Sequence, residues 1–139
     1  MKELTQNEIN LLLDRAQEAR DHAYAPYSRY SVGAALLTAD GQIYQGCNIE
    51  NAGFTATICA ERTAFFKAVY DGHRAFRAIA VIATGEAQGF PCGVCRQVMA
   101  EFCEKDFIIV TANRDRTLVD VSTFGELLPH SFGPKDLGV

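Results

Sequence analysis

Apolar residues recur along the chain at two different periods, and their order predicts the succession of helices and strands. Near the N-terminus they follow helical spacing at Ile9, Leu12, Leu13, Ala16, Ala19 and Ala23. This pattern predicts an amphipathic helix that ends before Pro26, because the residue before a proline disfavours helical geometry. Thr5 and Glu8 form a capping box that marks the start of the helix.

Residues 31–37 are apolar nearly throughout, which predicts a strand that is covered on both faces of a sheet. Asp40-Gly41 is a strong hairpin signal, so residues 43–47 are expected to return as the partner strand. Residues 48–57 show no clear periodicity and carry polar groups. We expect a loop there.

The rest of the chain continues the alternation of helices and strands. Helices are expected over 59–70, with Gly72 capping the end, after Pro91 up to Phe102, and over 126–128. Strands are expected over 76–84 and 107–110, with an edge strand over 117–121. A parallel pair with a right-handed crossover should join 76–84 to 107–110. The sequence therefore predicts an α/β fold, a three-layer α/β/α sandwich with a mixed five-stranded sheet, with residues 1–139 as one domain.

Composition narrows the class of partner. Hydrophobic residues make up 48% and charged residues 22%, as in ordinary soluble globular proteins. The net charge of -4 and the lack of a basic run argue against nucleic acid and favour a small substrate. Neither a signal-peptide pattern nor a stretch long enough to span a membrane is present. Five cysteines, an odd number, favour a reducing compartment, so we expect the cytoplasm.

Three cysteines and one acid form the candidate chemical centre. Cys92 and Cys95, two residues apart, would alone be compatible with a zinc site, a redox pair or a helix start. A third thiol, Cys59, stands at another predicted helix start, and Glu61 follows it by two residues. One zinc ion held by the three thiols, with an open position for water, accounts for all of these parts. Glu61 would then move protons without binding the metal.

Two spare cysteines could complete a purely structural zinc site, which normally has a fourth protein ligand. Cys47 stands at a strand end and Cys103 on the apolar side of a predicted helix. We interpret both as small buried hydrophobic residues. The open fourth position then favours a catalytic site.

Counting the charges predicts that the zinc site needs positive charge from its surroundings. Three thiolates around a doubly charged ion leave a net charge of about -1, which would make a bound water less acidic. Each helix N-terminus contributes roughly half a positive charge. Arg62, beside the motif, can donate a hydrogen bond to a cysteine sulfur. Hydrolytic removal of an amino group from a heterocycle fits these parts, because Glu61 could pass the protons between water, ring nitrogen and departing ammonia.

Six stretches carry a resemblance to a known family: residues 24–28, 32–36, 46–52, 59–64, 91–97 and 126–129. With them the chain resembles the small, tetramer-forming cytidine deaminases over nearly its whole length. The resemblance implies zinc-dependent conversion of cytidine or deoxycytidine, with water, to uridine or deoxyuridine and ammonia. It implies one zinc ion per subunit, held by Cys59, Cys92 and Cys95, with Glu61 as proton shuttle.

The resemblance also implies how the nucleoside is bound. Asn48 and Glu50 would hydrogen-bond the ribose, chiefly its 3′-hydroxyl, and their spacing on an extended segment places both on one side. The backbone amide of Ala60 would meet the pyrimidine carbonyl. The carbonyl of Phe90, which replaces a small polar residue, would meet the departing amino group. Tyr30 stands where a phenylalanine usually stacks on the base.

Two aromatic residues would serve neighbouring subunits of a homotetramer in which each site is completed by its neighbours. Phe54 occupies a position usually held by a tyrosine that reaches a neighbouring site, so the hydroxyl contact would be missing. Phe132 matches an aromatic residue that closes the site of another subunit. A packed tail residue is the structural alternative for Phe132.

Two other functions stay open from the sequence. One is a deaminase with another substrate, such as the aminonucleoside blasticidin S or a base within nucleic acid. Asn48 with Glu50 favours a free ribose, and the acidic balance disfavours a polynucleotide. The other is a non-enzymatic module stabilised by zinc, in which Glu61 would be dispensable.

Overall fold

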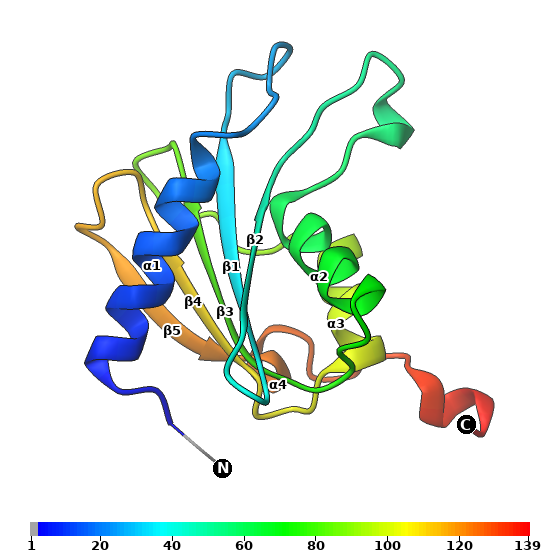
Figure 1. Ribbon diagram of the computed structural model, residues 1–139. Helices are drawn as coiled ribbons and strands as arrows, with labels where there is room; N and C mark the ends of the chain where they lie inside the picture. The colour runs from blue at the N-terminus through cyan, green and yellow to red at the C-terminus, as the bar shows by residue number, and fades with distance from the viewer. Residues whose placement is uncertain (1–2) are drawn as a thin grey trace.

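A five-stranded sheet in the order β2-β1-β3-β4-β5 forms the centre of the computed structural model, which describes residues 3–139 (Figure 1). β1 pairs antiparallel with both β2 and β3, β3 pairs parallel with β4, and β4 pairs antiparallel with β5. The sheet is therefore mixed, as predicted. The strands are β1 (Val32–Thr38), β2 (Ile43–Cys47), β3 (Phe76–Ala83), β4 (Ile108–Ala112) and β5 (Val119–Thr123).

Helices cover both faces of the sheet, which confirms the three-layer sandwich. α1 lies on one face, and α2 and α3 lie on the other (Figure 1). Each face has its own buried apolar cluster, in which α1 packs on alternate residues of β1, β3 and β4 and α2 packs on the intervening ones. The helices are α1 (Gln6–Arg20), α2 (Ala60–Tyr70), α3 (Gly93–Phe102) and α4 (Phe124–Leu127), with short 3-10 turns at Phe54–Ala56 and Pro134–Leu137.

The first helix starts as predicted but ends earlier. The Thr5 hydroxyl accepts a hydrogen bond from the Glu8 amide at 3.1 Å, and the Glu8 carboxylate accepts one from the Thr5 amide at 2.9 Å. α1 stops at Arg20, well before Pro26. The reason is tertiary, because Tyr24 pairs with the segment after β2: its amide donates to the Asn48 carbonyl, and its carbonyl accepts from the Glu50 amide.

Other boundaries also shift where side chains compete for the backbone. β5 begins two residues later than expected because Thr117 lies in the preceding turn, where its hydroxyl accepts from the Asn113 side chain at 2.9 Å. The stretch 48–57 is not a plain loop. Ile49 and Ile58 exchange two backbone hydrogen bonds of 3.0 Å each, which tie the two ends of the stretch together. Cys103 was predicted to lie on the apolar side of a helix. It instead follows α3 as its C-terminal cap, where it is partly buried.

Strand direction brings one set of loops together at the end of the sheet where β1 begins and where β2 and β3 stop. β2 and β3 both run antiparallel to β1, so their C-terminal ends lie beside the N-terminal end of β1. The segments before β1, after β2 and after β3 therefore meet at this end. Within residues 3–139, no helix is long and apolar enough to cross a lipid bilayer.

Candidate active site

Three cysteine thiols meet where α2 and α3 begin. Cys59 is the N-cap of α2, Cys92 is the N-cap of α3, and Cys95 lies in the first turn of α3. Their sulfur atoms all lie within 4.8 Å of one another, and those of Cys59 and Cys92 are 3.7 Å apart. A tetrahedral zinc ion with Zn–S bonds of about 2.3 Å separates its sulfur ligands by about 3.8 Å. The thiols therefore fit a zinc ion.

The surroundings of the thiols supply positive charge. Two helix N-termini point at the cluster, and the Arg62 Nη2 donates a hydrogen bond to the Cys59 sulfur at 3.3 Å. The pKa of the Cys59 thiol is lowered, because the Cys95 thiol donates a hydrogen bond to it and Arg62 adds another. This environment favours a thiolate at Cys59, and a thiolate is the form that binds metal.

Glu61 is a buried acid beside this cluster. Its side chain lies in the first turn of α2, and the residue is only 4% exposed. Burial raises the pKa of its carboxyl to about 7, and the negative charge of Cys59 acts in the same direction. A carboxyl group with a pKa near neutral can both accept and return a proton at neutral pH. Among the described residues, the candidate metal cluster comprises the three thiols and does not include Glu61.

A cavity of about 240 Å³ connects these groups to the nucleoside-binding residues predicted from the sequence. Its walls come from the loop before β1, the segment after β2, the start of α2 and the loop before α3. This size suits a small ligand. The predicted residues that line it are Tyr30, Asn48, Glu50, Cys59, Ala60, Glu61, Phe90 and Cys92.

Asn48 is held rigidly in the cavity wall. It is buried, its Oδ1 accepts from the Val32 amide at 2.8 Å, and its Nδ2 donates to the Tyr30 carbonyl at 2.8 Å. The two contacts fix which end of the amide is oxygen, because a backbone amide can only donate and a carbonyl can only accept. One N–H group of Nδ2 stays available for a ligand.

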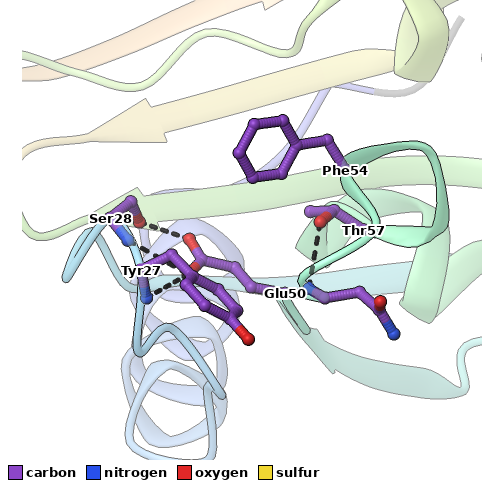
Figure 2. A pocket seen from close by; sticks show the side chains of 6 residues that line it. Tyr27, Ser28, Glu50, Phe54 and Thr57 are labelled. Carbon is purple, nitrogen blue, oxygen red and sulfur yellow. Dashed lines mark hydrogen bonds between the residues drawn. The ribbon is translucent and has the colours of Figure 1, made fainter.

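Glu50 is held by the loop before β1 (Figure 2). Its Oε1 accepts from the Tyr27 and Ser28 amides at 2.9 and 3.1 Å, and its Oε2 accepts from the Ser28 hydroxyl. The hydrogen bond from the Ser28 hydroxyl lowers the pKa of the Glu50 carboxyl most, and the hydrogen bonds from the two backbone amides lower it further. Ser28 was not predicted as a site residue. The sequence signal that could have found it is its place in the 24–28 stretch that carries the family resemblance, in the loop before β1.

A second hollow of about 420 Å³ adjoins the first, with Ser28, Glu50 and Thr57 lining both. Phe54 lines this outer hollow and is 81% exposed (Figure 2). Phe132 is 56% exposed, and its carbonyl accepts from the Gln97 side chain at 2.9 Å. Within one chain, neither Phe54 nor Phe132 lines the cavity that contains Glu61.

Comparison with known proteins identifies the family. The family described as the cytidine and deoxycytidylate deaminase zinc-binding region matches residues 6–111. The chain belongs to this deaminase family. It is 49% identical over 130 residues to the cytidine deaminase of Sporosarcina psychrophila, with 94% of this chain and 95% of that protein aligned. Zinc is accordingly the cofactor, and the three thiols form a cluster that could hold it.

Solved structures agree with this assignment. The crystal structure of cytidine deaminase from Burkholderia pseudomallei superposes with a TM-score of 0.86 at 44% identity, over 93% of this chain and all of that one. That of Mycobacterium tuberculosis cytidine deaminase gives a TM-score of 0.77 at 36% identity, over 89% and 96% of the two chains. The family resemblance and the α/β fold class inferred from the sequence are both confirmed.

Proposed function

We propose that this protein catalyses the hydrolytic deamination of cytidine and deoxycytidine to uridine and deoxyuridine, with release of ammonia. The observation that carries the proposal is one cavity in which two of the clustered thiols, the buried Glu61 carboxyl and the Asn48–Glu50 pair all meet. The first two groups supply hydrolytic chemistry. The amide and carboxylate pair suits a sugar hydroxyl, which both donates and accepts a hydrogen bond.

Cys59, Cys92 and Cys95 would hold the zinc ion. When bound, zinc supplies Lewis acidity that lowers the pKa of a water from about 15.7 toward about 7. Glu61 would take one proton from the attacking water and give it to the ring nitrogen. It would then take the second proton, from the hydroxyl now on the ring carbon, and give it to the departing amino group, which leaves as ammonia. Its pKa of about 7 suits each transfer, because neither the charged nor the neutral form is strongly disfavoured at neutral pH.

Backbone groups around Glu61 would orient the pyrimidine ring. Ala60 is the first residue of α2, so its amide has no acceptor within the helix and can donate to the pyrimidine carbonyl. The Phe90 carbonyl would accept from the amino group that departs, and Tyr30 would stack on the ring. Ala60, Phe90 and Tyr30 all line the cavity, which supports these roles.

The assembly is also a proposal. We expect a homotetramer of one-domain subunits, residues 1–139, in which Phe54 and Phe132 reach the sites of neighbours. Their exposure in a single chain supports this, because large exposed aromatic side chains are enriched at interfaces. The cytoplasm is the proposed location, because three reduced thiols are needed to bind zinc.

An ultraviolet assay of the purified protein tests the function. Cytidine, deoxycytidine, cytosine and blasticidin S are compared on one sample whose zinc content is measured. We expect turnover of the two nucleosides at one zinc per chain, little turnover of free cytosine, and none of blasticidin S. Turnover of blasticidin S in preference to cytidine would contradict the substrate assignment.

The Glu61→Gln variant tests the proton shuttle in the same assay. It should bind zinc fully and lose turnover, because the amide keeps the size of the side chain but cannot accept and return protons. A zinc-loaded Glu61→Gln protein with activity near the wild-type level would rule out the shuttle role.

A further inference from the structure

Ser28 links two parts of the nucleoside cavity through one hydroxyl group. The hydroxyl donates a hydrogen bond to the Glu50 Oε2 and accepts one from the Tyr30 amide at 3.0 Å. Both directions are forced, because an ionised carboxylate can only accept and a backbone amide can only donate. Figure 2 shows Ser28 beside the Glu50 carboxylate, with the Tyr27 amide bonded to the same group.

These contacts leave Glu50 with limited capacity for a ligand. A carboxylate offers about four acceptor positions, two on each oxygen. Oε1 accepts from two backbone amides, and Oε2 accepts from the Ser28 hydroxyl. One acceptor position therefore remains, on Oε2. That number matches a single sugar hydroxyl, whose one proton needs one acceptor.

The same connections reach the other side of the cavity. The Tyr30 amide donates to Ser28, and the Tyr30 carbonyl accepts from the Asn48 side chain. The backbone of Tyr30, the residue expected to stack on the base, is therefore held between Asn48 and Ser28, and Ser28 in turn contacts Glu50. Ser28 is the member of this network that contacts both Glu50 and Tyr30.

We propose that Ser28 is a positioning residue that orients the Glu50 carboxylate, so that its one free acceptor position faces the 3′-hydroxyl of the nucleoside. This inference rests on the proposed function. Without the Ser28 hydroxyl, Oε2 has two open positions, and water or a rotated carboxylate competes with the sugar. The two amides on Oε1 stay in place, so the carboxylate is loosened and not lost.

The test compares substrates with and without the hydroxyl. Ser28→Ala should lower kcat/KM for deoxycytidine by about tenfold, the typical effect of one hydrogen bond to a charged group. For 2′,3′-dideoxycytidine, which has no 3′-hydroxyl, the loss should stay below about twofold on the same reasoning. The deoxycytidine loss should appear mainly in KM, because the sugar hydroxyl gains no charge in the reaction. The ratio of the two losses on one sample does not depend on the folded fraction.

Three further variants make the result specific. Ser28→Thr keeps a hydroxyl and should recover most of the lost kcat/KM. Ser122→Ala removes a serine from β5, at the opposite edge of the sheet from β2, and should leave both substrates unaffected. In a Glu50→Ala background, Ser28→Ala should cost no more than about twofold further, because its effect acts through Glu50.

Two outcomes would overturn the positioning role while the deaminase function stands. One is a loss that is equal for both nucleosides or persists in the Glu50→Ala background, which would mean that Ser28 only supports the loop. The other is a Ser28→Ala variant as active as Ser122→Ala. Wild-type protein that does not deaminate deoxycytidine would overturn the proposed function itself, and this inference with it.

Discussion

Gly46 on β2 is the point where the N-terminal end of α2, whose N-cap is Cys59, lies against the sheet. A Cβ atom built at Gly46 would lie 2.3 Å from the Ala60 carbonyl oxygen and 2.6 Å from the Ala64 nitrogen. Both are backbone atoms of α2, so no flexible side chain can move aside. We therefore predict that Gly46→Ala displaces the helix that carries Cys59 and Glu61 to the cavity.

The size of the effect follows from the distances. Real Cβ atoms essentially never approach other heavy atoms closer than 3.0 Å, so the 2.3 Å contact requires a shift of about 0.7 Å or more. Overpacking of this kind typically lowers the free energy of unfolding by about 1–3 kcal/mol. A displacement of about 1 Å in a catalytic group can cost about 100-fold in rate. We expect kcat to fall between about tenfold and 100-fold.

Gly33→Ala is the matched control for this prediction. Its Cβ would lie 1.9 Å from the Ala16 carbonyl oxygen, so the clash is with α1 on the opposite face of the sheet. Both variants should lower the melting temperature. Only Gly46→Ala should also lower kcat per folded, zinc-loaded chain, measured by the ultraviolet assay with zinc content and circular dichroism on the same sample. Equal kcat in the two variants would refute the link between the Gly46 contact and the site.

Two further predictions concern the metal and the sugar. Cys92→Ala should lose zinc and melt at a lower temperature, because zinc that binds to the folded state stabilises that state. The control variant Cys47→Ala should keep one zinc per chain. A Cys92→Ala protein that still carries a full complement of zinc would remove that thiol from the ligand set. Asn48→Ala should lower kcat/KM for deoxycytidine by about tenfold and the free energy of unfolding by about 1–3 kcal/mol, because the Val32 amide loses its acceptor. Kinetics and urea unfolding check the Asn48 variant, and an unchanged KM would contradict the sugar contact.

Local sequence signals predicted most elements correctly because their causes are local. The capping box at Thr5 and Glu8, the turn at Asp40-Gly41 and the apolar run of β1 each act over a few residues. The predicted boundaries fail where a distant partner intervenes. α1 ends early because Tyr24 pairs with the segment after β2, and Thr117 leaves the edge strand for a turn with Asn113.

Residue types and spacings by themselves determined the class of chemistry. Two cysteines in one short motif, a third followed by Glu61, and the acidic net charge indicated a zinc hydrolase with a small substrate. The tertiary structure decided how those groups meet. Cys59 and Cys92 are 33 residues apart, and they come within 3.7 Å because β2 and β3 end at the same edge of the sheet and each is followed by a helix that starts there.

The orientation of the residues proposed to bind the sugar is also a tertiary result. In the sequence, Asn48 and Glu50 are two polar residues in a stretch without periodicity. In the fold, the Val32 amide and the Tyr30 carbonyl fix the Asn48 amide, and Ser28 holds the Glu50 carboxylate. The hydrophobic pattern of the sequence does not predict these contacts. They join the start of β1 and the segment before it to the segment after β2, and the pairing of β1 with β2 brings these segments together. The sequence supplies the donors and acceptors, and the fold determines which of them remain free for a ligand.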